Sequence, residues 1–156
     1  MNITTLKQLA EADLKLQVIN RPDFPYPVKT AYKDKTANEL ERSICAFFKV
    51  IGGMAERVKN MGREVTTIQK HDCSVFGEVT QENRKFIPGT GRKGTSDVKA
   101  LYGGKSYAIE VKIGRDRMSQ AQKEYKADFE RAGGYYIEAK TFEQFSEEFY
   151  KIKQLK

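Results

Sequence analysis

Residues 97–113 read DVKALYGGKSYAIEVKI, and this stretch decides the fold. Within 106–113 apolar and polar residues alternate, as expected of a β-strand with one face in a core. Residues 97–101 form the expected partner strand, because the Gly-Gly pair at 103–104 suits a two-residue type I′ or II′ hairpin turn. Counting outward from this turn pairs Tyr102 with Lys105 and brings Asp97 opposite Glu110 on the same face.

Two carboxylates at directly opposed positions repel each other, because their Cβ atoms lie only about 4.5–5.5 Å apart. Such a pair needs a cation or a shared proton. Mg²⁺ suits it, since this ion takes oxygen ligands, usually one or two carboxylates together with water and phosphate. Lys112, two residues beyond Glu110 on the same face, can stabilise charge developing on a phosphate or an attacking water. The hairpin alone fits equally well with an ordinary exposed face whose Asp, Glu and Lys are solvated charges.

Helices are predicted at four places where a Ser or Thr is followed three residues later by Glu or Gln, the capping-box pattern. These pairs are Thr5–Gln8, Thr36–Glu39, Ser119–Gln122 and Thr141–Gln144, each followed by apolar residues at helical spacing. Two of the helices are expected to end at Gly-Gly, at 52–53 and 133–134. Besides the strand at 106–113, strands are predicted at 54–60 and 135–139, and an additional hairpin is predicted at 64–69 with 84–88. The pattern indicates an α/β fold.

The length and charge of the chain set outer bounds on its organisation. With 156 residues, we expect a single domain over 1–156. The net charge of +7 makes a polyanion a plausible partner, although basic charge alone is more often a solvated surface. Two cysteines are too few for a disulfide framework, and no apolar run approaches the ~20 residues that span a bilayer. We therefore expect a cytoplasmic protein with no membrane association.

The spacing of several short strings resembles a known family. The string at 94–97 (GTSD) precedes the string at 109–112 (IEVK), so that Asp97 lies thirteen residues before Glu110. The string at 118–122 (MSQAQ) follows. Together they resemble the VRR-NUC family of the PD-(D/E)XK nuclease superfamily, especially small phage-type members. Ser96 departs from the proline that often precedes the aspartate. The resemblance covers roughly residues 37–150. It implies a nuclease core at 36–156, with an N-terminal arm at 1–35 and an insertion at 61–88, in a protein of a bacterial or phage-infected cell.

The resemblance implies a PD-(D/E)XK nuclease-like core, with a central mixed β-sheet flanked by helices, that hydrolyses DNA with Mg²⁺; Mn²⁺ is expected to substitute. It places Asp97, Glu110, Val111 and Glu41 at the metal, with Lys112 assisting the water or the transition state. Gln122 corresponds to the helix glutamine of the family. Gln122 also closes the capping box of Ser119, so a structural role is equally well supported, and Glu41 has the alternative of a solvated helix charge.

Basic residues flank the carboxylates in the sequence. Arg92 and Lys93 precede Asp97 in a glycine-rich loop, and Arg115 and Arg117 follow Lys112, so all four are predicted to contact DNA; solvated loops are the alternative. The G-x-G-x-x-G string at 89–94 is not a dinucleotide site, because no helix follows it.

The main hypothesis is an endonuclease, with branched or junction DNA as the substrate suggested by analogy. A catalytically inactive DNA-binding module of the same fold and a protein-interaction domain are the alternatives. A homodimer would suit the cutting of both strands.

Overall fold

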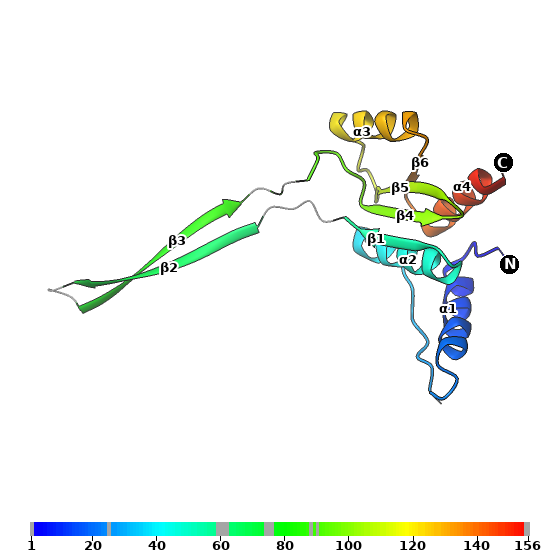
Figure 1. The fold of residues 1–156 in the computed structure, drawn as a ribbon, viewed down its shortest axis with the longest axis horizontal. Coiled ribbons are helices and arrows are strands. Elements are labelled where there is room, and N and C mark those ends of the chain that lie inside the picture. The colour runs from blue at the N-terminus through cyan, green and yellow to red at the C-terminus, as the bar shows by residue number, and fades with distance from the viewer. Residues whose placement is uncertain are drawn as a thin grey trace. The chain divides into compact units, whose positions relative to one another are not determined.

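The computed structural model describes residues 2–24, 26–58, 63–73, 77–87, 89 and 91–154. The chain divides into two compact units (Figure 1). One comprises Met1–Val58 with Gly94–Lys156, and the other Lys59–Lys93. The insertion predicted at 61–88 falls within the second unit, although its residues 61, 62, 74–76 and 88 lie outside the described ranges.

The first unit is built on a four-stranded mixed sheet. Its strands, in spatial order, are β1 (Met54–Arg57), β4 (Val98–Tyr102), β5 (Lys105–Val111) and β6 (Tyr135–Ala139). The β1–β4 and β4–β5 pairs are antiparallel, whereas β6 runs parallel to β5. The strand predicted at 135–139 has the predicted bounds, and the one predicted at 54–60 ends at Arg57, with residues 59 and 60 outside the described ranges. The chain is therefore α/β with a central mixed sheet.

In the part of the chain that the structure describes, four helices flank this sheet, and their beginnings follow the capping pattern. They are α1 (Leu6–Asn20), α2 (Ala37–Val50), α3 (Gln120–Arg131) and α4 (Phe142–Gln154). Complete capping boxes begin α1, α2 and α3, and the Gln144 amide donates to the Thr141 hydroxyl at 3.2 Å before α4. Gly52 and Gly133 follow α2 and α3 with φ of 81° and 88°, which confirms the predicted ends. No helix in the described ranges is long and apolar enough to cross a bilayer.

The main core lies on one face of the sheet, under α1, α2 and α4. Aromatic residues of α2 and α4 pack around Phe47, whose ring makes edge contacts with Phe48, Phe142, Phe145, Phe149 and Tyr150. The N-terminal arm belongs to this core, because Ile3 and Leu9 are buried in it and the Ile3 amide donates to the Tyr150 hydroxyl at 2.8 Å.

The opposite face of the sheet is covered by α3, over β5 and β6. Ala108, Tyr125 and Tyr136 form a small buried cluster there, with Met118 and Phe129 packed against it. Tyr125 is thus a core residue, as helical aromatics usually are. Consequently β5 is buried on both faces from Tyr107 to Val111, including the face that carries Glu110.

The second unit is a two-stranded antiparallel ribbon. It consists of β2 (Arg63–Cys73) and β3 (Gly77–Ile87), paired over their whole length with Thr67 opposite Asn83. The additional hairpin predicted at 64–69 with 84–88 is confirmed as a longer ribbon; residue 88 lies outside the described ranges.

Candidate active site

The hairpin between β4 and β5 places the first carboxylate. Gly103 and Gly104 have φ of 58° and 74°, which matches the positive φ at both central positions of a type I′ turn. The strands pair from Tyr102 with Lys105 to Val98 with Ile109, as predicted. The same count puts Asp97, the residue before β4, opposite Glu110. Its carboxylate oxygen Oδ2 accepts a hydrogen bond from the Val111 amide at 2.9 Å, so Asp97 lies at the end of β5.

Glu110 is the buried centre of the site. It is only 1% exposed, yet it carries a carboxylate in the middle of a sheet. Its Oε1 accepts a hydrogen bond from Gln122 Nε2 and lies 3.2 Å from Lys112 Nζ. Its Oε2 is buried with no hydrogen-bond partner among the described residues. Burial, and then the negative charge of Asp97, raise the pKa of Glu110 from 4.5 to about 7.

Lys112 joins the carboxylates to the loop that follows β5. It is 5% exposed, and its Nζ lies 3.2 Å from Glu110 Oε1, Asp116 Oδ2 and Gln122 Oε1 alike. Burial lowers its pKa, but the hydrogen bonds and charges of Glu110 and Asp116 outweigh burial and raise the pKa overall. Lys112 is therefore a charged ammonium held in place, and the alternative of an ordinary solvated hairpin face is wrong for Glu110 and Lys112.

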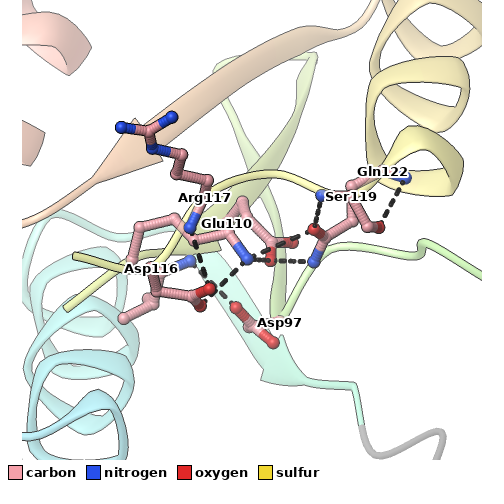
Figure 2. Close-up of polar contacts among 8 residues, drawn as sticks. Asp97, Glu110, Asp116, Arg117, Ser119 and Gln122 are labelled. Carbon is pink, nitrogen blue, oxygen red and sulfur yellow. Dashed lines mark hydrogen bonds and ion pairs between the residues drawn. The ribbon is translucent and has the colours of Figure 1, made fainter. Parts of the chain in front are cut away.

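Gln122 closes the capping box, as predicted, and also contacts Glu110, while its catalytic role stays a prediction. Its Oε1 accepts from the Ser119 amide at 2.8 Å, and the Gln122 amide donates to the Ser119 hydroxyl at 3.3 Å, which completes the capping box of α3. Its Nε2 donates to Glu110. Figure 2 shows the cap and the carboxylate joined through this one side chain.

Gly94 holds the Asp97 loop against the beginning of α3. A Cβ at Gly94 would lie 2.3 Å from the carbonyl carbon and oxygen of Ala121 and 2.7 Å from the Gln122 amide nitrogen. Its φ of 77° is also one that favours glycine. The loop and the helix therefore contact each other through their backbones. This contact fixes the position of Gln122 relative to Asp97.

Sequence reasoning missed three residues beside the site. Asp116 bonds to Lys112, and Tyr136 and Glu138 lie on β6, where Glu138 is in register with Glu110. The Tyr136 hydroxyl is buried beside the Glu110 carboxylate, and burial, followed by the charges of Glu110 and Asp97, raises its pKa. The strand pattern of residues 135–139 could have indicated that Tyr136 lies on one face of a strand. Only the parallel pairing of β6 with β5 shows that this is the face that carries Glu110.

The remaining predicted site residues, apart from Val111, make no contact with Asp97, Glu110 or Lys112 among those that the structure describes. Glu41 forms an ion pair with Arg57 of β1 at 2.5 Å, and it is absent from the contacts drawn in Figure 2. Arg115 and Arg117 are exposed in the loop before α3, and the Arg117 guanidinium points away from the carboxylates in Figure 2. Arg92 and Lys93 are exposed residues of the second unit, joined to Asp97 through residues 94–96. Val111 contributes its amide, and metal binding by its carbonyl stays a prediction.

Comparison with known proteins gives no family for this chain. No protein-family model matches it, and no curated protein matches it in sequence. Within the described ranges, no group of three or more His, Cys, Asp and Glu side chains is placed to hold a metal, so the candidate ligands are the pair Asp97 and Glu110. The geometry of this pair and of its neighbours is what any proposal on function depends on.

Proposed function

We propose that this chain is a metal-dependent DNA nuclease with a PD-(D/E)XK-like core, and that Asp97, Glu110 and Lys112 form its centre. One observation carries the proposal: a carboxylate and an ammonium are buried together at the end of β5, beside a second carboxylate. Burying such charges costs stability, and replacement by apolar residues is often neutral or stabilising. Perturbed carboxylates next to a charged lysine are typical of functional sites.

The residues fit a divalent cation. The pKa of Glu110 is raised by burial and then by the charge of Asp97, and its Oε2 is buried with no hydrogen-bond partner among the described residues. The two carboxylates are therefore an oxygen donor set that suits a cation. Asp97 and Glu110 would hold the ion, and Glu41 and the Val111 carbonyl are further proposed ligands or water holders. When bound, Mg²⁺ polarises a phosphoryl oxygen and lowers the pKa of its water.

The protein's own side chains supply the rest of the chemistry. Lys112, held by Glu110, Asp116 and Gln122, presents a fixed positive charge that stabilises negative charge on the phosphate or the attacking water. Gln122 holds the Glu110 carboxylate in orientation. Arg92, Lys93, Arg115 and Arg117 are proposed to bind the DNA backbone, and a homodimer is proposed for substrates that need two cuts.

A cleavage assay with a matched carboxylate control tests this proposal. Asp97→Asn and Glu110→Gln should abolish Mg²⁺-dependent or Mn²⁺-dependent cleavage of plasmid, single-stranded, flapped and four-way junction DNA. Glu56→Gln, which neutralises an exposed carboxylate on β1 of the same sheet, should cleave like the parent. Calorimetric Mn²⁺ binding should weaken in the first two variants only.

The alternative of an inactive DNA-binding module makes a different prediction for the parent chain. It expects DNA binding with no cleavage of any of the four substrates in either metal. Cleavage that persists in both Asp97→Asn and Glu110→Gln would show that the reaction belongs to another site or to a contaminant.

A further inference from the structure

The β2–β3 ribbon is a separate surface that the proposed site does not use. Each strand has eleven residues, and all the described side chains except Val65 are exposed. No other described element belongs to its unit. A two-stranded hairpin with both faces in water is marginally stable at best. A ribbon of this length therefore indicates a surface that gains a partner.

The register separates the side chains of the ribbon into two chemically different faces, because directly opposed residues of an antiparallel pair point to the same side. Pairs such as Thr66 with Arg84 and Ile68 with Glu82 define one face, and pairs such as Thr67 with Asn83 define the other. The first, which we term the acid face, carries Glu64, Thr66, Ile68, Lys70, Thr80, Glu82, Arg84 and Phe86. The second, the amide face, carries Val65, Thr67, Gln69, Asn83, Lys85 and Ile87. Among the side chains that the structure describes, both carboxylates of the ribbon lie on the acid face.

The amide face has the chemistry of a nucleic-acid reader. Asn83 and Gln69 each offer a donor and an acceptor, the arrangement that bonds bidentately to an adenine edge in the major groove, and Thr67 offers a hydroxyl and a methyl group. Lys85 adds a cation for phosphate. The acid face is unsuitable, because Glu64 and Glu82 repel phosphate and Arg84 lies 3.6 Å from Glu82.

The dimensions of the ribbon fit duplex DNA. Eleven residues at about 3.3 Å each span roughly 36 Å, close to one turn of B-DNA. The major groove, about 12 Å wide, admits a two-stranded β-ribbon. The twist of paired strands, visible in Figure 1, lets one face follow a helical groove.

A second copy of the chain is a poorer occupant for this face. Two amide faces packed together would bring Lys85 of both copies to a surface where the described side chains include no carboxylate to pair with it. We infer that the amide face of the β2–β3 ribbon docks duplex DNA in the major groove. This inference rests on the proposed function for its substrate, but its binding surface can be tested without cleavage.

Neighbouring threonines on opposite faces supply a matched test. Thr67→Glu on the amide face and Thr66→Glu on the acid face add the same charge to the same strand at exposed positions. Fluorescence anisotropy would follow binding of the full chain to a labelled duplex of about two helical turns, in EDTA so that no cleavage occurs. Thr67→Glu should weaken affinity by about tenfold or more, and Thr66→Glu by less than about twofold.

A second pair of variants tests the same faces without adding negative charge. Lys85→Gln should reduce the slope of log affinity against log salt by up to about 0.9, whereas Arg84→Gln should leave it nearly unchanged. Circular dichroism should show the same strand content in all four variants.

The outcomes separate this inference from the proposed function. Weaker binding by Thr67→Glu in a chain that never cleaves DNA would support the ribbon and reject the nuclease. Equal effects of Thr66→Glu and Thr67→Glu, or no effect of either, would overturn the ribbon even if the chain cleaves. A change of mass in sedimentation equilibrium on Thr67→Glu, without a change in DNA affinity, would assign the amide face to a second copy and likewise overturn the inference.

Discussion

Gln122, at the beginning of α3, donates a hydrogen bond through its Nε2 to Oε1 of Glu110 on β5. The same side chain accepts the Ser119 amide and so closes the capping box of its own helix. The helix beginning and the buried carboxylate are therefore mechanically linked. A change at Gln122 disturbs both, and the two effects have to be separated by comparison with a cap elsewhere.

Gln8 provides that comparison, because it closes an equivalent capping box with Thr5 at the start of α1. Gln8→Ala and Gln122→Ala should each lose about 0.5–1.5 kcal/mol of unfolding free energy from the missing cap bond. Gln122→Ala should lose about 1–3 kcal/mol more, because a buried carboxylate is left short of a donor. It alone should slow DNA cleavage. Urea unfolding and single-turnover cleavage measure the two effects, and equal rates in both variants would show that Gln122 serves the cap only.

Gly94 should be intolerant of a side chain for a reason beyond its positive φ. Gly94→Ala forces a Cβ onto the Ala121 and Gln122 backbone, whereas Gly52→Ala, at a similar φ of 81°, meets nothing within 4 Å. Both substitutions should lower the free energy of unfolding by about 1–2 kcal/mol, because alanine is disfavoured in the left-handed conformation. Thermal unfolding should show Gly94→Ala clearly less stable than Gly52→Ala, with slower cleavage. Matching melting temperatures would contradict the close approach of the loop to α3.

The positions of some site residues can be predicted from the sequence, because they depend on local turn and capping chemistry. The positions of others depend on tertiary packing. Gly103 and Gly104 fix a turn and therefore a register, so Asp97 and Glu110 could be placed opposite each other in advance. Capping boxes likewise predict where helices begin. The contact of Gln122 with Glu110 depends on the crossover from β5 through α3 to β6, which no local pattern encodes. Tyr136 and the burial of Lys112 follow from the same crossover.

Glu110 should make the stability of the metal-free protein depend on pH. Its pKa is raised in the fold to about 7 from 4.5, so between these values the folded state keeps a proton that the unfolded chain has lost. The free energy of unfolding therefore falls as pH rises from about 4.5 to about 7, by at most roughly 3 kcal/mol from this group. Below about 4.5 both states are protonated, and the penalty vanishes.

Urea unfolding in EDTA at several pH values across this window measures the effect. Glu110→Gln should flatten the decline and gain stability at neutral pH, while Glu56→Gln, an exposed control, should keep the parent slope. An unchanged slope in Glu110→Gln would mean that Glu110 ionises as an ordinary carboxylate in the folded chain.

Lys112 carries the most specific prediction on catalysis. Its ammonium is held by Glu110, Asp116 and Gln122, so its charge is fixed before a phosphate arrives. Lys112→Ala should slow single-turnover cleavage by about 10²–10³, the usual loss for one electrostatic contact made in the transition state. Lys112→Arg should rescue poorly, since a planar fork cannot replace a compact charge. Saturating enzyme and metal isolate the chemical step from binding.

Two controls make the result on Lys112 interpretable. Asp116→Asn removes the exposed partner of Lys112 but leaves its contact with Glu110, so it should cleave within a few-fold of the parent. Lys112→Met keeps the buried stem without the charge, so it separates loss of packing from loss of the ammonium. Both Lys112→Ala and Lys112→Met should still bind duplex DNA, because the proposed role is realised only as charge develops. If both cleave at the parent rate while folded, Lys112 merely neutralises Glu110, and the nuclease proposal loses its central cation.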